Sequence, residues 1–279
     1  LYGILTGFSI STQRAVIMMG CMLLARLAGR HYDGLSALSF SAICQLLIHP
    51  MVLFQTGFLL SYGTVLGIYV FVDVFCDAWE SKNPIWMAVA GTAGIELVTL
   101  PILLTAYYEF SILSIAANVL FLPFMGGILV TSLAGIGLGS ITLFAGKFCF
   151  GFAHFCFMLF EWIGNLFVKI PGAVVITGKP TDWQVLLYYG SGVLFLFLQK
   201  WKQKKIFLLT LAFGVFVLFL PVHNNFDLQI TNLDVGQGDC SCIRTKNHTI
   251  LIDGGSSDVN KVGKYRMVPF LKSQGISYV

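Results

Sequence analysis

The chain has 279 residues, of which 57% are hydrophobic and 11% are Asp, Glu, Lys or Arg, against about 25% charged residues in an ordinary soluble domain. This composition and a mean hydropathy of +0.82 exclude a soluble globular enzyme, a disordered chain and a disulfide scaffold. The net charge of +4 is too small to indicate a partner by itself. The composition predicts a mostly α-helical protein with most of its length in a membrane.

Charged side chains gather at the carboxyl-terminal end. The segment from Phe226 to Val279 holds 5 acidic and 6 basic side chains in 54 residues. This shift predicts a polytopic transmembrane helical domain over residues 1–222 and a second domain over residues 226–279. The chain opens on Leu1 and has no basic region before its first apolar stretch, so we expect no signal peptide. We expect both ends to continue into a longer protein.

Nine apolar stretches precede residue 223. They are Ala15–Ala28, Leu35–Phe54, Gly57–Phe75, Pro84–Leu104, Ile112–Leu129, Leu129–Phe144, Phe148–Phe167, Trp183–Leu198 and Ile206–Val222. A simple helical span needs about 20 residues, so the shortest stretches, such as Ala15–Ala28, suggest half-helices or re-entrant segments. The sequence predicts six to nine membrane segments.

Prolines and glycines mark points where these helices break or approach one another. Pro50, Pro101 and Pro123 lie in or beside apolar stretches, where proline removes a backbone donor and bends or breaks a helix. A break lined by protein or water and a simple kink are both open interpretations. Two glycine pairs have the G-x-x-x-G spacing that permits close helix packing: Gly63 with Gly67, and Gly135 with Gly139.

Four lysines crowd the connection before the last apolar stretch: Lys200, Lys202, Lys204 and Lys205. Short basic loops remain in the cytoplasm. We therefore expect Ile206–Val222 to lead outward and the segment after it to lie outside the cytoplasmic membrane.

The hydrophobic pattern changes after Pro221. Strands are predicted at Leu228–Val235, Cys240–Arg244 and Thr249–Asp253, with a turn at Lys246-Asn247. A short helix over Pro269–Ser273, stopped by Gly275, should follow, and another strand should begin at Ile276.

Polar residues within apolar stretches are the first functional candidates, because they are costly in lipid. They are Arg14, Gln45, His49, Glu96 and Asn118. An interhelical hydrogen bond, or a side chain that reaches the interface, is the alternative for each. Arg14 and His49 are the strongest of the five.

The apolar stretch Phe148–Phe167 carries a stripe of five residues at three- and four-residue steps, which therefore share one helical face, and four of the five are polar. The stripe consists of His154, Met158, Glu161, Asn165 and Lys169. Such a face is typical of a helix that lies in the membrane interface or lines a water-filled passage. Both interpretations are open.

No catalytic or metal-binding constellation is evident. Five cysteines lie in or beside apolar stretches as small hydrophobic residues, while Cys240 and Cys242 share one face of a predicted strand. The histidines form no H-x-H or H-E-x-x-H pair, and neither a Walker A motif nor a G-x-S-x-G elbow is present. An ATP-driven pump, a serine hydrolase and an intramembrane enzyme are therefore disfavoured.

Two glycine-rich turns carry the most specific sequence. The first contains Asp234, Gly236, Gly238 and Asp239, and the second contains Asp253, Gly254 and Gly255. Together they resemble the opening of a metallo-β-lactamase-like α/β domain, in the form carried by the ComEC family, the inner-membrane DNA channel of bacterial natural competence. The membrane part agrees, since Gly7-Phe8-Ser9-Ile10, Thr12-Gln13-Arg14-Ala15 and Gly57-Phe58-Leu59-Leu60-Ser61 after Pro50 are similar to that family's competence domain.

The resemblance implies a bacterial inner-membrane protein that passes single-stranded DNA into the cytoplasm and carries the beginning of an external nuclease-like domain. Its expected partners are membrane lipid and other DNA-uptake proteins, and no cofactor is expected in this segment. It implies a truncated lactamase-like domain, since the family's H-x-H-x-D-H metal motif would follow the strand that begins at Ile276. Asp253 matches a structural carboxylate of that fold, and no residue here matches a ligand of the metal. Zinc or manganese is expected only in the longer protein, and a homo-oligomer is a further expectation.

A polyanion needs a wet, positively biased path with stacking surfaces for its bases. The candidates for such a path are Arg14, His49, Asn118, His154 and Asn165. A small-molecule secondary transporter is the alternative, favoured by the interrupted apolar stretches but not by the external domain.

Overall fold

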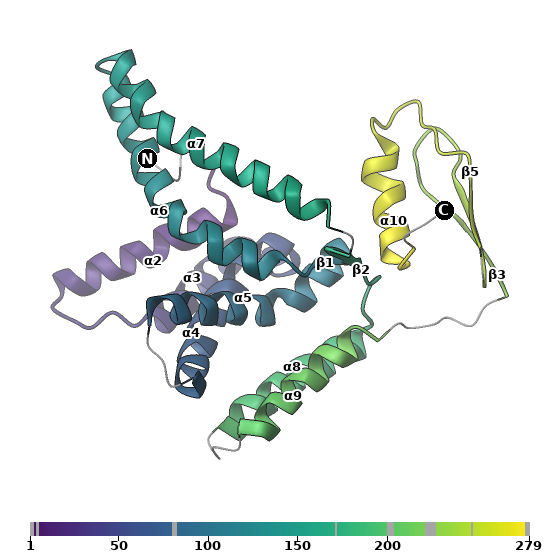
Figure 1. The fold of residues 1–279 in the computed structure, drawn as a ribbon, viewed down its shortest axis with the longest axis horizontal. Helices are drawn as coiled ribbons and strands as arrows, with labels where there is room; N and C mark the ends of the chain where they lie inside the picture. Colours follow the sequence, from purple (N-terminus) through teal and green to yellow (C-terminus); the bar gives the residue numbers. More distant parts are fainter. Residues whose placement is uncertain are drawn as a thin grey trace.

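The computed structural model describes residues 3, 6–79, 83–170, 172–199, 204–220, 227–246 and 248–276. It is mostly helical, and small sheets lie between α5 and α8 and near the carboxyl terminus (Figure 1). The helical part consists of α2 (Ile10–Leu27), α3 (Gly34–Ile48), the 3-10 helix η1 (Pro50–Phe54), α4 (Thr56–Trp79), α5 (Pro84–Tyr107), α6 (Ser114–Gly139), α7 (Leu143–Val168), α8 (Asp182–Gln199) and α9 (Lys204–Leu218).

Five of these helices are long and apolar enough to cross a membrane: α2, α4, α5, α6 and α7. Three shorter apolar helices, in α3, α8 and α9, accompany them within the described ranges. The half-helix expected at Ala15–Ala28 is wrong, because α2 begins at Ile10 and has 18 residues, which is about 27 Å at 1.5 Å per residue. Its first turns are polar, so hydropathy alone does not reveal them.

Helices α4 and α5 cross where two glycines meet. A Cβ on Gly67 would lie 2.5 Å from the Gly94 carbonyl oxygen, and a Cβ on Gly94 would lie 2.6 Å from the Gly67 carbonyl oxygen. This contact confirms the close packing predicted from the Gly63 and Gly67 spacing. The helices therefore meet backbone to backbone.

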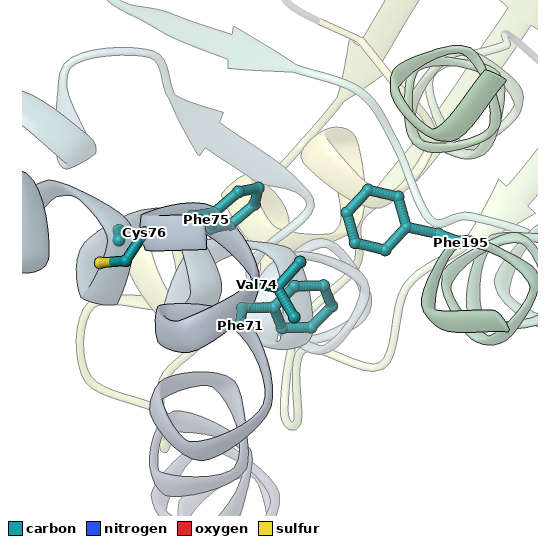
Figure 2. Packing of buried hydrophobic residues seen from close by; sticks show 6 residues of the cluster. Phe71, Val74, Phe75, Cys76 and Phe195 are labelled. Carbon is teal, nitrogen blue, oxygen red and sulfur yellow. The ribbon is translucent and has the colours of Figure 1, made fainter. Parts of the chain in front are cut away.

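Aromatic side chains join α8 to this pair. Figure 2 shows Phe195 of α8 directed toward Phe71 and Phe75 of α4, with ring centroids 5.8 and 6.4 Å apart. Phe195 is fully buried, and Ala90 of α5 belongs to the same cluster. Aromatic packing of this kind fixes α8 against the α4 and α5 pair.

The α6 and α7 helices form a hairpin that extends away from the other helices in Figure 1. The two segments expected to meet at Leu129 are instead one continuous helix of 26 residues. The chain turns after Gly139, where a Cβ on Gly146 would lie 2.7 Å from the Gly139 Cα. The glycine spacing correctly indicated close packing, whereas the boundary predicted at Leu129 from the apolar stretches was wrong.

The three prolines behave differently. Helix α3 stops before Pro50, which begins η1, so the predicted break occurs there. Pro101 and Pro123 lie inside α5 and α6, which continue through them, so of the two open interpretations the break is excluded at both. In α5 the group that Pro101 leaves without its helical donor, the Leu97 carbonyl, accepts a hydrogen bond from Tyr188 instead.

A two-stranded antiparallel sheet that the sequence did not predict ties the helix ends together. Strand β1 (Glu109–Ser111) follows α5, and β2 (Val174–Ile176) precedes α8. Phe110 pairs with Val175 at its centre. The sheet thereby holds the end of α5 beside the start of α8.

The carboxyl-terminal segment is a separate small unit in Figure 1. An antiparallel sheet of β3 (Leu228–Asn232), β4 (Ser241–Thr245) and β5 (Thr249–Ile252) precedes a π-helical turn, η2 (Gly263–Met267), and α10 (Val268–Ser273). These bounds confirm three predicted strands and the short helix, and Gly275 has the positive φ of +70° expected at its stop. The strand predicted from Ile276 falls largely on residues 277–279, outside the described residues.

The two faces of this sheet differ in burial. Cys242 lies on the face that carries a small core of Val235, Cys240 and Val262. The other face leaves four aliphatic side chains about half exposed: Leu228, Ile230, Ile250 and Ile252. Cys240 and Cys242 are both buried, and both thiols are free.

Candidate functional site

The predicted path residues fall into two groups. Arg14 and His49 belong to the α2 and α3 region, while Asn118 lies on α6 and His154 and Asn165 lie on α7. Asn118 is half-buried, and both α7 residues are exposed.

Arg14 lies among polar groups of three helices. Its guanidinium carbon lies 6.0 Å from the ring centroid of Tyr62, a cation–π distance. Ser41 donates to the Leu38 carbonyl at 2.8 Å, so the Tyr62 hydroxyl is the donor in its 2.9 Å hydrogen bond to Ser41. Arg14 Nε is buried without a hydrogen-bond partner among the described residues. The cation is therefore held in place but incompletely satisfied.

His49 lies at the break between α3 and η1 and lines a cavity of about 410 Å³. Three amide side chains share this cavity: Gln13, Gln45 and Gln55. Gln45 is 3% exposed, and its amide nitrogen donates to the Ile10 carbonyl at 3.1 Å. Amides and an imidazole together offer hydrogen-bond donors and acceptors to a polar ligand. Sequence reasoning did not select Gln13 and Gln55 as site residues, because both lie outside the apolar stretches.

The polar stripe on α7 is confirmed as one exposed face. His154, Glu161, Asn165 and Lys169 are exposed, and Met158 is 57% exposed. The opposite face, with Ala153 and Cys156, is buried beside Ile128 of α6. A helix long enough to span a membrane thus presents polar side chains away from its hairpin partner.

A second polar cavity, of about 200 Å³, lies between the helices and the carboxyl-terminal segment. Its lining includes Thr177, Lys179, Thr181, Arg244, Ser273 and Gln274. Two cations from segments 65 positions apart in the sequence thus share one cavity. Neither was a predicted site residue, since Lys179 lies in a short connection and Arg244 in a strand.

Three contacts hold this junction. Lys272 Nζ lies 2.6 Å from Glu109 Oε2, and the Lys179 amide donates to the Ser273 carbonyl at 2.8 Å. A Cβ on Gly178 would lie 3.2 Å from the Gly275 amide nitrogen. The carboxyl-terminal segment is therefore docked on the loops that carry β1 and β2.

The two glycine-rich turns lie against each other. A Cβ on Gly236 would collide with the Asp258 carboxylate, and one on Gly238 would collide with the Gly255 carbonyl. Gly236 also has a φ of +83°, so glycine is required there on both counts. The predicted motif is thus one local structure.

Asp258, which sequence reasoning missed, anchors these turns. Its Oδ1 accepts from the Gln237 amide at 2.8 Å and from the Ser256 hydroxyl at 2.7 Å. These hydrogen bonds lower the pKa of the Asp258 carboxyl below its usual value. Asp234 accepts from the Gly236 amide at 3.2 Å. Within the described ranges no three His, Cys, Asp or Glu side chains are grouped to hold a metal ion.

These features define a multi-pass integral membrane protein with a small carboxyl-terminal segment of three strands and a helix. The family model described as "Competence protein" matches residues 1–204. The chain belongs to this competence protein family. No solved structure matches it.

Three curated relatives align with 99% of the chain. They are ComE operon protein 3 of Bacillus subtilis, 27% identical over 299 residues; Competence protein ComA of Neisseria gonorrhoeae, 27% identical over 293 residues; and Recombination protein 2 of Haemophilus influenzae, 24% identical over 326 residues. The aligned regions cover 38%, 38% and 40% of those proteins. The chain thus spans about two fifths of the length of these relatives.

Proposed function

We propose that this chain forms part of a bacterial inner-membrane channel that passes single-stranded DNA into the cytoplasm. The observation that carries the proposal is its membership of the competence protein family, with 99% of the chain aligned to competence and recombination proteins. The expected surroundings are membrane lipid and other DNA-uptake proteins, with a second copy of the chain as a further partner.

The polar face of α7 supports a wet passage. Polar side chains at membrane depth lie against protein or water, because lipid does not satisfy them. His154, Glu161 and Asn165 have no covering helix among the described residues. Phe155 and Trp162, which are 64% and 65% exposed, lie beside them and offer stacking surfaces for bases.

The junction cavity supports an entry point for the DNA backbone. Lys179 and Arg244 bring two positive charges to a cavity whose other lining groups include hydroxyls. Such groups bind phosphate oxygens. A DNA strand held there would lie between the carboxyl-terminal segment and the helices.

We place the carboxyl-terminal segment outside the cytoplasm, as the beginning of a metallo-β-lactamase-like domain whose zinc or manganese ligands lie in the longer protein. The orientation rests on the basic connection of Lys200 to Lys205, of which residues 200–203 lie outside the described residues. The lactamase-like assignment rests on the paired glycine turns and the three-stranded sheet.

A small-molecule transporter is the second candidate. The interruption between α3 and η1, beside the His49 cavity, favours it, since broken helices form the substrate sites of many transporters. The match to the competence protein family favours DNA as the transported substrate.

The proposal is tested at Arg14 in the full-length parent. Arg14→Ala should reduce entry of labelled DNA into the cytoplasm at least several-fold while DNA bound at the cell surface stays unchanged, because an intramembrane cation offsets phosphate charge where water is scarce. Arg14→Lys keeps the charge and is the matched control. Equal DNA entry in the unmodified protein and both variants, at equal protein level, would remove Arg14 from the path. Uptake of a small solute, without uptake of DNA, would favour the transporter.

A further inference from the structure

Glu96 is a carboxyl group in the middle of α5 that the proposed path does not use. Its side chain is 8% exposed, and Oε2 is buried without a hydrogen-bond partner among the described residues. The hydroxyl of Ser114, the first residue of α6, is the nearby polar group, and it too is buried without a partner that meets hydrogen-bond geometry. An unsatisfied acid at this depth calls for a functional explanation.

The other hydroxyl groups around Glu96 already donate elsewhere. Thr92 and Thr99 lie one turn before and after it, and their hydroxyls donate to the Ala88 and Ile95 carbonyls at 2.9 and 2.8 Å. Tyr188 of α8 faces Glu96 but donates its proton to the Leu97 carbonyl at 2.6 Å. These oxygens therefore have lone pairs, but no proton, to offer the carboxyl group.

Charged side chains do not compensate Glu96 in the described part of the chain. The two ion pairs found there, Lys246 with Asp227 and Lys272 with Glu109, lie outside the spanning helices. On α4, which packs on α5 through Gly67, both carboxyl groups, Asp73 and Asp77, are exposed. The titratable group that faces Glu96 from α8 is the Tyr188 phenol, and α6 contributes the Ser114 hydroxyl.

A negative charge buried without a partner is strongly unfavourable. A bound proton removes that charge and gives the carboxyl group a donor for the free lone pairs around it. A sodium ion would need several oxygen ligands, which transporters commonly supply from unwound backbone. Here α5 is continuous, and its Leu97 and Val98 carbonyls already accept from Tyr188 and Tyr189. The surroundings thus suit a proton.

We propose that Glu96 is an exchangeable proton-binding site at the contact between α5 and α6. When water reaches the site, Oε2 takes a proton from a hydronium ion, whose O–H bond breaks to leave water, and the new O–H bond on Oε2 is kept when the helices pack. When Ser114 moves away and water reaches the site, that O–H bond breaks and the proton passes to water, leaving a hydrated carboxylate. Proton occupancy of Glu96 is thereby linked to whether α6 stays against α5.

Labelling by dicyclohexylcarbodiimide tests this in the unmodified protein, purified in lipid nanodiscs. The reagent partitions into apolar surroundings and adds to protonated carboxyl groups, so mass spectrometry should find the adduct at Glu96, falling several-fold from mildly acidic to alkaline pH. Asp73 and Glu161, which are exposed, are the internal controls and should show little adduct. No adduct at Glu96 at any pH, or one that does not change with pH, would overturn the proposal.

Two variants make the test independent of DNA transport. Glu96→Gln imitates the protonated form and should remove a carboxyl infrared band that disappears on alkaline titration, whereas Asp73→Asn should retain it. Glu96→Asp keeps a titratable group and should retain a shifted band. If these bands behave as expected while DNA fails to cross, the proton site stands and the proposed transport fails; unchanged titration in Glu96→Gln overturns the site whatever the transport result.

Discussion

The hydroxyl of Tyr188 donates a 2.6 Å hydrogen bond to the carbonyl of Leu97, across 91 positions of the chain. Pro101 has no amide hydrogen, so this carbonyl lacks its usual helical donor. Tyr189 donates to the next carbonyl, that of Val98, at 3.0 Å. Two adjacent tyrosines of α8 thus satisfy the backbone of α5 where its own hydrogen bonding is weakest.

Tyr188→Phe should therefore destabilise the helical part by about 1–3 kcal/mol, because the part-buried Leu97 carbonyl loses the donor that replaces its helical one. Unfolding in mixed micelles monitored by circular dichroism measures this. Tyr107→Phe is the control, since Tyr107 is 54% exposed. In a Pro101→Ala background the helix regains its own donor, so the same tyrosine change should cost clearly less; equal losses in both backgrounds would contradict the pairing.

Gly67→Ala should separate α4 from α5. Its Cβ would lie 2.5 Å from the Gly94 carbonyl oxygen, and overpacking of this kind costs about 1–3 kcal/mol. Gly20→Ala on α2 is the matched control, because nothing lies within 4 Å of a Cβ there. Thermal unfolding of the two variants should differ in sign or size, and identical midpoints would show that α4 and α5 are not in backbone contact.

The thiols of Cys240 and Cys242 should react slowly with iodoacetamide. Burial raises the pKa of both thiols, with Asp253 contributing at Cys240 and Cys240 contributing at Cys242. The folded segment therefore holds less thiolate than the unfolded chain at neutral pH, and alkylation should accelerate as pH rises. Because the thiol pKa is higher in the folded state, the contribution of the protonated thiols to the free energy of unfolding is fully present below the ordinary thiol pKa of about 8.5. It is lost as pH rises through the thiol pKa of the folded state. Alkylation at the same rate before and after unfolding would contradict this.

Single cysteines at Lys202 and Asn247, in a background without other accessible cysteines, test the orientation. If the basic connection is cytoplasmic, a membrane-impermeant maleimide should label position 247 and spare position 202 in cells whose outer barrier has been opened. Detergent-permeabilised cells, in which both should react, are the control. Labelling at 202 but not at 247 would reverse the orientation.

The sequence predicted those features that depend on local pattern. Apolar length located the main helices, alternation located β3 to β5, and the spacing of His154 to Lys169 located an exposed polar face. The start of α2 was missed because Ser11 to Arg14 are polar, although a helix begins there. The sequence left a break or a kink open at Pro101 and Pro123, because the residues near a proline do not show whether another helix supplies a donor, as Tyr188 does for Leu97, or whether the helix continues.

Long-range features had no local signal. Strands β1 and β2 have three residues each and pair across more than sixty positions, as in Phe110 with Val175. Lys179 and Arg244 share a cavity only because Gly178 and Lys272 dock two distant segments. Sites made by such docking depend on tertiary packing, which a single sequence does not display.

The exposed aliphatic face of the β3 to β5 sheet has a practical consequence for handling the protein. Leu228, Ile230, Ile250 and Ile252 form a patch on a segment that is otherwise charged, and patches of this kind adsorb detergent or associate with one another. The segment expressed without its membrane helices should therefore self-associate, although its composition resembles that of a soluble domain. Replacing Ile230 and Ile250, which flank Ile243 on neighbouring strands, with threonine would keep strand propensity while making the segment monodisperse.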